Sequence, residues 1–347
     1  SIFKIYIKFM QSYDQKSYKL FYNWLLISFC MVFAMIIIGG LTRLTDSGLS
    51  ITEWELFTGI LPPLDSDTWN KYFLLYKEIP QYQLINASMT MEEFKIIFYW
   101  EYFHRMLGRL IGLFFLIPLL YFHLMTKINK KHIYLCYLIL SLIIFQGLVG
   151  WYMVKSGLVN NVTVSHYRLS LHLSIAFIII SLIFWLILNI KKKTFKNFFT
   201  LSKNNFLLFF LIFIIFGQVI MGAFVSGLDA GKIYQTWPLM NNGYFPNDLI
   251  INKVKDFFDF ESHSLIQFYH RNMAYFILAY TLFIGVTIFK NNERKLIKPF
   301  YFLITILFLQ IFLGIITLLS GLNMLIASGH QIFSLLLMLS AINLYYY

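Results

Sequence analysis

Eight apolar stretches, each long enough to cross a lipid bilayer, constrain the fold of this chain more than any other feature. A helix of about 20 apolar residues spans the hydrocarbon core of a membrane. Hydrophobic residues make up 59% of the 347 residues and charged residues only 13%, which excludes an ordinary soluble domain. We therefore predict an all-α membrane protein with eight transmembrane helices at about 22–41, 96–125, 133–154, 168–189, 206–226, 265–289, 299–319 and 326–346.

The charged residues between these stretches predict how the chain is oriented. More than half of the 28 lysines and arginines fall in four connections, at 1–21, 126–132, 190–204 and 290–298. Since loops on the cytoplasmic side collect Lys and Arg, we place these segments and both termini on the cytoplasmic or matrix side. The net charge of +12 reflects this topology and forms no single basic face, so we expect no nucleic-acid partner.

The second half of the chain repeats the first. Three motifs recur in order: D-x-G-x5-W at 46–54 and 229–237, [EQ]-[YF]-[FY]-H-R at 101–105 and 267–271, and Q-x-x-x-G at 146–150 and 310–314. Because each half holds four predicted helices, both copies enter the membrane in the same direction. We predict two parallel-repeat four-helix bundles, one formed by residues 1–200 and one by residues 201–347.

Four histidines, His104, His172, His270 and His330, lie near the outer ends of the even-numbered predicted helices, and counting back from the inner basic clusters puts them at one depth. One such histidine is more often a wetted or hydrogen-bonded residue. Four in duplicated positions favour two haem sites, because two imidazoles across a bundle suit haem iron, whereas zinc takes three or four protein ligands. The remaining histidines are interpreted as solvated or capping residues: His123, His132, His166 and His263.

A carboxylate accompanies only the first histidine of the first half. Glu101 lies one helical turn before His104 on the same helical face, and the duplicated position holds neutral Gln267. A carboxylate at this depth is costly unless it is paired or catalytic. Two interpretations stay open: a structural ion pair with Arg105 or Arg109, or a reactive N-terminal half beside an electron-transfer cofactor in the C-terminal half.

Three arginines, Arg105, Arg168 and Arg271, are adjacent to these histidines or one helical turn away. Haem propionates need cationic partners near the water boundary, so we predict that these arginines help to bind haem. Snorkelling towards lipid phosphates is the alternative for each of them. A capping box formed by Thr90 and Glu93 predicts that the second membrane helix begins outside the bilayer.

These motifs resemble those of the haem A synthases, membrane enzymes required for cytochrome oxidase maturation. The resemblance covers nearly the whole chain and includes G-G-L-T-R-L-T-D-S-G-L-S-I-T-E-W at 39–54, E-x-x-H-R-x-x-G-R at 101–109, Y-R-x-x-L-H at 167–172, T-W-P-L-M at 236–240 and G-H-Q at 329–331. It implies an enzyme that oxidises the C8 methyl of haem O to the formyl group of haem A through successive hydroxylations with water-derived oxygen.

The resemblance also implies roles for the histidine pairs. His270 and His330 hold a haem b cofactor, while His104 and His172 lie in the pocket of the substrate haem O together with a catalytic Glu101. The chain has no cysteine pair in its first outer loop, so it resembles the alphaproteobacterial or mitochondrial type.

Further implications concern location and partners. The expected location is a bacterial or mitochondrial inner membrane, with the haem sites near the outer, periplasmic or intermembrane-space face. Haem O synthase and cytochrome oxidase assembly factors are candidate partners besides membrane lipid, and a homo-oligomer stays open.

Two other classes of protein remain open at this point. A di-haem b-type membrane electron carrier or quinol oxidoreductase would hold haem b permanently in both halves. A transporter built from parallel repeats would need broken helices near the bilayer midplane, whereas the polar residues of this chain cluster at the outer face.

Overall fold

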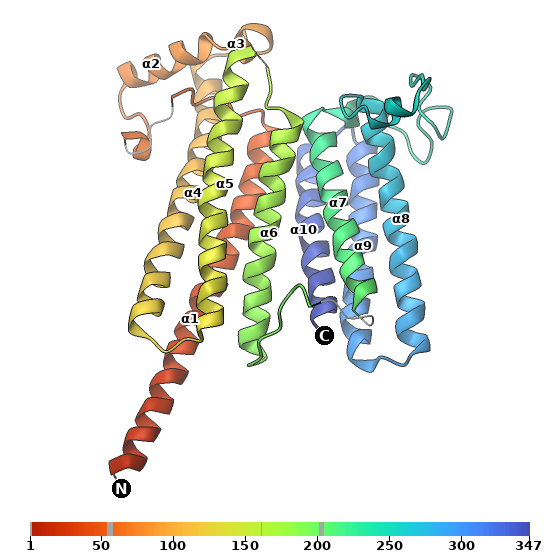
Figure 1. Ribbon diagram of the computed structural model, residues 1–347. Helices are drawn as coiled ribbons and strands as arrows, with labels where there is room; N and C mark the ends of the chain where they lie inside the picture. The colour runs from red at the N-terminus through yellow and green to blue at the C-terminus, as the bar shows by residue number, and fades with distance from the viewer. Residues whose placement is uncertain (1, 54–57, 161, 201–204) are drawn as a thin grey trace.

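The computed structural model describes residues 2–53, 58–160, 162–200 and 205–347, and these residues are mostly helical (Figure 1). Within them, eight helices are long and apolar enough to cross a membrane, which confirms the predicted number. These helices are α1 Ile2–Leu44, α4 Met91–Met125, α5 Lys130–Asn160, α6 His166–Lys191, α7 Phe206–Gly227, α8 His263–Lys290, α9 Arg294–Leu319 and α10 Met324–Tyr346. Trp54 of the first D-x-G-x5-W motif and residues 201–204 of a predicted inner loop lie outside the described residues.

The eight helices stand side by side, and both termini lie at the same end of the bundle (Figure 1). In the first half, α1 packs on α4 and α6, and α5 also packs on α4 and α6. In the second half, α7 and α9 each pack on α8 and α10. Contacts of α6 with α7 and of α1 with α10 join the two groups. Each span is one continuous helix, unlike the broken helices of parallel-repeat transporters.

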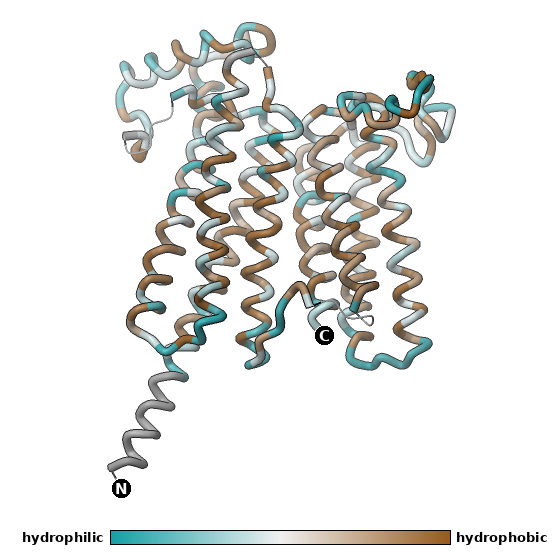
Figure 2. The backbone as a smooth tube through the Cα atoms, viewed as in Figure 1, coloured by the Kyte–Doolittle hydropathy of each residue, from teal (hydrophilic) through white to brown (hydrophobic). Residues whose placement is uncertain are grey.

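Apolar residues follow the helices along their length, and hydrophilic residues gather in the connections at both ends of the bundle (Figure 2). Several large apolar side chains face away from the bundle, among them Ile117 and Leu124 on α4 and Val286 on α8. So much exposed apolar surface would be a liability in water but matches a hydrocarbon environment. The surface of the bundle therefore supports a membrane protein independently of the length of its helices.

Aromatic packing joins α1 to α4 near the inner end. Phe21 and Trp24 lie one turn apart on α1, and Phe115 and Phe122 lie two turns apart on α4, so each pair shares a helical face. The ring centres of Trp24 and Phe115 are 4.7 Å apart, and those of Phe21 and Phe122 are 5.0 Å apart. The Trp24 indole also donates a hydrogen bond to Phe114 O at 3.0 Å, which satisfies its polar atom.

The outer connections contain short helices that the hydropathy pattern did not predict. They are η1 Thr58–Ile60, α2 Ser66–Lys77 and α3 Pro80–Leu84 in the first half, and η2 Ala230–Lys232 and η3 Val254–Phe258 in the second. The predicted capping box of Thr90 and Glu93 is confirmed at the start of α4. The helix begins five residues earlier than its apolar stretch, because this cap is formed by polar residues outside the hydrocarbon region.

α2 packs on the outer part of α4 through one apolar face. Trp69, Phe73 and Tyr76 recur at helical spacing, and all three are buried. Trp69 and Phe98 meet edge to face with ring centres 5.0 Å apart, while Phe73 stacks on Phe94 at the same distance. This aromatic layer holds the first outer loop against α4, on the same helix as His104.

Candidate functional site

The four histidines at the outer ends of α4, α6, α8 and α10 meet in two pairs. The ring centres of His104 and His172 are 6.4 Å apart, and their planes are inclined by 66°. The ring centres of His270 and His330 are also 6.4 Å apart, with an inclination of 83°. Among the described residues, no three His, Cys, Asp or Glu side chains gather into a metal site, so each pair offers two protein ligands.

The separation of the rings matches an iron atom placed between two imidazoles. With a metal–nitrogen bond of about 2 Å and a ring nitrogen about 1 Å from its ring centre, two axial imidazoles have centres roughly 6 Å apart. A porphyrin supplies the remaining ligands in its own plane. Both pairs therefore have the spacing that a haem with two axial histidines requires.

A glycine on a neighbouring helix faces each of these four imidazoles. A Cβ built on any of the four glycines would lie between 2.8 and 3.2 Å from the facing ring, closer than an ordinary van der Waals contact. The pairs are Gly39 with His104, Gly150 with His172, Gly222 with His270, and Gly314 with His330. A larger residue at these positions would push the imidazole away. The sequence motifs contain Gly39, Gly150 and Gly314, but the role of these glycines emerges only from the packing.

Hydrogen bonds to the backbone orient the C-terminal pair. Nδ1 of His330 lies 3.1 Å from Gln310 O. Since a carbonyl oxygen only accepts, Nδ1 carries the proton and Nε2 keeps its lone pair for a metal. A backbone carbonyl is a common second partner of metal-bound histidines. Gln218 Nε2 donates to His270 O at 2.9 Å, which ties α7 to α8 beside the same site.

Two imidazole nitrogens in these pairs lack a protein partner. Nδ1 of His172 and Nδ1 of His270 are buried, and no hydrogen-bond partner lies nearby in the described part of the chain. A buried polar atom without a partner costs free energy. Each pair thus has one buried imidazole nitrogen whose partner would have to come from a bound group.

The two pairs lie at the same level of the bundle. Gly39 of α1 faces His104, and the next residue, Gly40, lies against Gln331, which follows His330 on α10. Consecutive residues of α1 thus contact His104 of the first pair and the residue that follows His330 of the second pair.

Glu101 lies one turn before His104 and is only 2% exposed. Its Oε2 accepts hydrogen bonds from Ser50 Oγ at 2.7 Å and from Ile51 N at 2.8 Å, both in the first outer loop. Its Oε1 forms an ion pair with Arg105 Nη2 at 2.6 Å. The ion-pair interpretation is thus realised with Arg105, and the same carboxylate anchors the first outer loop to α4.

Gln267 lies at the corresponding position in the second half and is also buried. Its Nε2 donates to Tyr234 O at 2.9 Å. Arg271 Nη2 donates to the same carbonyl at 2.9 Å, just as Arg105 Nη2 donates to Ile51 O at 2.8 Å. Tyr234 follows Ile51 by 183 positions, the offset of the D-x-G-x5-W motif, so the two sites are built from corresponding segments. The carboxylate is the main difference between them.

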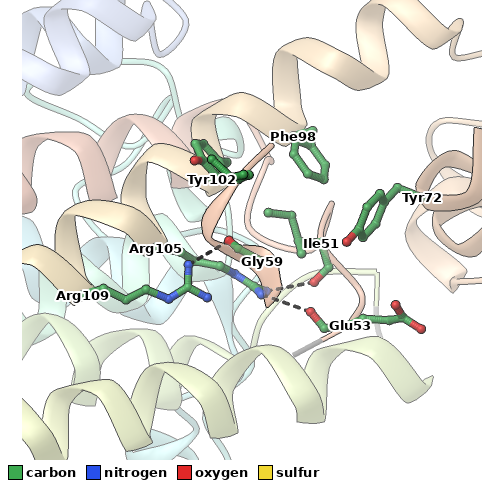
Figure 3. Close-up of a pocket in the computed structure, with 9 residues that line it drawn as sticks. Ile51, Glu53, Gly59, Tyr72, Phe98, Tyr102, Arg105 and Arg109 are labelled. Atoms are coloured by element: carbon green, nitrogen blue, oxygen red, sulfur yellow. Dashed lines mark hydrogen bonds between the residues drawn. The ribbon is translucent and has the colours of Figure 1, made fainter. Parts of the chain in front are cut away.

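Arg105 and Arg109 line a pocket beneath the first outer loop (Figure 3). Besides its bonds to Glu101 and Ile51, Arg105 donates to Glu53 O at 3.4 Å, and Arg109 Nη1 donates to Gly59 O at 3.0 Å. The two guanidinium groups thus connect α4 to the backbone of the loop that covers it. The opposite wall is apolar and aromatic: Ile51, Leu61, Tyr72, Phe98 and Tyr102.

The three arginines predicted to bind haem have different partners. Arg105 pairs with Glu101, whereas Arg168 Nη1 donates to Ser156 Oγ at 2.6 Å and its guanidinium lies 5.0 Å from the ring centre of Tyr152. Arg271 bonds only to loop carbonyls, and its Nε is buried without a partner in the described residues. Arg271 is therefore the arginine best placed to accept a further anionic group.

The interpretation of the other histidines as solvated or capping residues is wrong for two of them. His132 is 6% exposed, near the rings of Tyr18 and Phe195. His166 is 5% exposed, with Nε2 3.8 Å from the Glu261 carboxylate. Both lie at helix ends where a neighbouring connection folds over them, which the depth of a residue along its own helix does not reveal.

Comparison with known proteins finds similarity along almost the whole chain. A family model, COX15-CtaA, described as a cytochrome oxidase assembly protein, matches residues 22–342. A protein named heme A synthase from Pelagibacter ubique (strain HTCC1062) is 50% identical over 319 residues, which cover 91% of this chain and 93% of that protein. Proteins of the same name from Rickettsia africae (strain ESF-5) and Rickettsia canadensis (strain McKiel) are 40% identical over 324 residues and 42% identical over 325 residues; both matches cover 91% of this chain and 94% of the relative.

Proposed function

This chain belongs to the COX15-CtaA family and to its haem A synthases, which are oxidoreductases, and we propose that it oxidises the C8 methyl of haem O to the formyl group of haem A. The reaction proceeds through successive hydroxylations with oxygen from water. One observation carries the proposal: two histidine pairs share a ring separation of 6.4 Å, but only the first has a carboxylate, Glu101, one turn away.

In this proposal the N-terminal half, residues 1–200, is the substrate half. His104 and His172 hold haem O near the outer face, and the facing glycines leave room for the imidazoles. Glu101 accepts protons or positions the attacking water. Its hydrogen bonds from Ser50 and Ile51 support this role, because they fix the carboxylate in one orientation under the covering loop.

The C-terminal half, residues 201–347, is the cofactor half. His270 and His330 hold haem b, which when bound supplies a one-electron acceptor for electrons removed from the substrate. The protonated Nδ1 of His330 and the glycines facing both rings support this assignment. The absence of a carboxylate at Gln267 suits a haem that takes part in electron transfer and is not itself modified.

Arg105, Arg168 and Arg271 bind the haem propionates in this proposal. Each lies at the outer end of a helix that carries a histidine, where a propionate can reach both a cation and water. Arg271 has the strongest support because its buried Nε lacks a partner among the described residues.

We further propose that the two halves are parallel repeats in a bacterial or mitochondrial inner membrane. In both halves a glycine contacts each histidine of the pair, which supports the repeat. Both termini lie at the same end of the bundle, as an even number of membrane spans requires (Figure 1). The basic residues in the inner connections support a cytoplasmic or matrix-side location of the termini, and in this proposal the haem sites lie near the periplasmic or intermembrane-space face. Haem O synthase and cytochrome oxidase assembly factors are proposed partners, and self-association is left to measurement.

The proposal is tested by purifying the protein from cells that make haem O, extracting its haems and identifying them by mass. Haem b together with haem O, its hydroxylated form or haem A is the expected result. Two equivalents of haem b per chain and no oxidised haem O would instead identify a di-haem electron carrier, which the equal ring separations of the two pairs also permit.

Variants test the separate roles. Glu101→Gln is expected to abolish conversion of haem O while haem b stays bound, and full conversion by this variant would disprove the catalytic role of Glu101. Glu92→Gln is the matched control on the same helix, because Glu92 is exposed and pairs with Lys95. His270→Ala is expected to lose haem b, and a normal haem b spectrum would refute the assignment of the C-terminal pair.

A further inference from the structure

Arg105 directly follows His104, and Arg271 directly follows His270. The two arginines differ in the group that neutralises their charge. Nε and Nη2 of Arg105 lie 3.0 and 2.6 Å from Glu101 Oε1, so a carboxylate of the protein compensates this charge. One turn before Arg271 the chain has Gln267, which carries no charge. The two halves thus differ, Glu in the first and Gln in the second, at the position that determines whether this arginine has a charged partner.

Arg271 is left with acceptors that carry no formal charge. Its Nη2 donates to Tyr234 O at 2.9 Å and its Nη1 to Leu239 O at 3.4 Å. Its Nε is buried and has no partner in the part of the chain that the structure describes. The corresponding Nε of Arg105 donates to the Glu101 carboxylate at 3.0 Å. The Nε–H group of Arg271 is therefore available as a donor, whereas the Nε–H group of Arg105 already donates to the Glu101 carboxylate.

A carboxylate is the group that best neutralises the charge of Arg271 and accepts a hydrogen bond from its unpartnered Nε. Neighbouring N–H groups of a guanidinium match carboxylate oxygens, and hydrogen bonds between ionised partners are about twice as strong as neutral ones. A buried N–H group of a cation that lacks a hydrogen-bond acceptor costs free energy. A carboxylate partner removes this cost. The propionates are the carboxylates that a haem held by His270 and His330 would bring to this place.

We propose that Gln267, because its side chain carries no charge, leaves Arg271 available to a propionate of haem b, and that this makes the C-terminal site retain its haem. In the N-terminal site Glu101 already neutralises Arg105, so Arg105 holds a propionate of the substrate haem less strongly than Arg271 holds one of haem b, and the substrate haem has to leave after it is oxidised. The inference rests on the proposed function, because it requires haem b between His270 and His330.

The test is the rate at which haem leaves the purified holoprotein for an excess of apomyoglobin, followed by absorbance. Gln267→Glu gives Arg271 the carboxylate partner that Arg105 has. We expect haem b to leave about tenfold faster than from the unmodified protein, the scale of losing one charge-assisted hydrogen bond. A rate equal to that of the unmodified protein would overturn the inference.

Gln267→Met is the matched control, because it keeps the length of the side chain, adds no charge and removes the hydrogen bond to Tyr234 O. It is expected to release haem at the unmodified rate. If Gln267→Met and Gln267→Glu accelerate release equally, the role of Gln267 is packing, and the inference is wrong.

Arg271→Gln provides a second measurement that does not depend on the folding of Gln267→Glu. It is expected to release haem faster than the unmodified protein, and Gln267→Glu added to it should change little, since the carboxylate then has no arginine to occupy. Additive effects, or unchanged release from Arg271→Gln, would contradict the inference.

These outcomes separate the inference from the proposed function. If the unmodified protein holds no haem that depends on His270, the assignment of the cofactor site fails. If it holds such a haem and Gln267→Glu releases it at the unmodified rate, the cofactor site stands and only the inference fails.

Discussion

The side chain of Gln331 on α10 fills the space that a Cβ at Gly40 on α1 would need. A Cβ built there would lie 1.6 Å from Gln331 Oε1, and Gln331 Nε2 donates to Ile36 O at 3.0 Å. The preceding residue, Gly39, faces His104. Two adjacent glycines thus let α1 pass between the two histidine pairs, and one amide side chain links α10 to α1 at that level.

Gly40→Ala should therefore destabilise the bundle. The added methyl collides with Gln331, and overpacking of this kind costs about 1–3 kcal/mol. The measurement is thermal unfolding in detergent. Gly112→Ala on α4 is the control, since a Cβ there meets no atom within 4 Å. Adding Gln331→Ala should restore part of the lost stability, and equal unfolding temperatures for Gly40→Ala and Gly112→Ala would contradict the prediction.

Gly314→Ala should lower the haem b content of the purified protein. A Cβ at this position would lie 2.8 Å from His330 Cε1, so the imidazole has to turn away from its partner. Haem per chain, determined as the pyridine haemochrome, is the readout. Gly147→Ala is the control because its Cβ meets nothing within 4 Å. Full haem content in Gly314→Ala would show that the ring does not need this space.

Arg43 joins the two halves at their outer ends. Its Nη1 lies 2.7 Å from Asp46, and its Nη2 lies 3.1 Å from Asp229 and 2.6 Å from Ser226 O. Because the aspartates are partly exposed, Arg43→Gln should lower the free energy of unfolding by only about 1 kcal/mol. Thermal unfolding at low and high salt checks this. Salt screens the ion pairs of Arg43, so the difference in unfolding temperature between Arg43→Gln and the unmodified protein should be smaller at high salt.

Lys71→Gln is the control for Arg43→Gln. It breaks an exposed ion pair with Glu53 within the first outer loop and leaves the junction of the halves intact. We expect no measurable change in its unfolding temperature. If Lys71→Gln lowered the unfolding temperature as much as Arg43→Gln, the junction would have no special role.

The cap of α2 should respond to acid. Hydrogen bonds from the backbone N–H and the hydroxyl of Thr68 hold the pKa of Asp65 below its usual value of 3.8. Because the pKa is lower in the folded state, the stabilisation is fully present above pH 3.8 and is lost as the pH falls further through the lowered pKa. Amide hydrogen exchange across α2, corrected for intrinsic rates, should show this loss of protection.

Asp65→Asn is the control for the acid response, because asparagine also caps helices but does not titrate. Its α2 amides should keep the same corrected protection across this pH range. Equal losses of protection in both proteins would show that the response arises elsewhere.

Most of the membrane helices could be predicted because hydrophobic length is a local property of the chain. The predicted starts of α1, α4 and α9 were too late, since polar residues extend each helix beyond its apolar stretch. α2 was missed although Trp69, Phe73 and Tyr76 have helical spacing. Its apolar face is short, and it forms a helix by packing on α4, a contact that the hydropathy pattern does not contain.

Part of the candidate site was also accessible from the sequence. The shared depth of the histidines and the difference between Glu101 and Gln267 follow from counting positions in a repeated pattern. The sequence did not determine whether Arg105 or Arg109 pairs with Glu101, because both arginines lie on the same predicted helix as Glu101. The first outer loop decides this, since it brings Ile51 and Gly59 to the two guanidinium groups.

By itself the sequence determined the eight spans, the order of the repeated motifs and the depth of the histidines, because all of these depend on position along the chain. Only the tertiary structure decided that each imidazole of the two pairs faces a glycine, that Gln331 lies against Gly40, and that Arg271 has no charged partner among the described residues. These are contacts between separate helices and loops, and their distances depend on how the backbones pack.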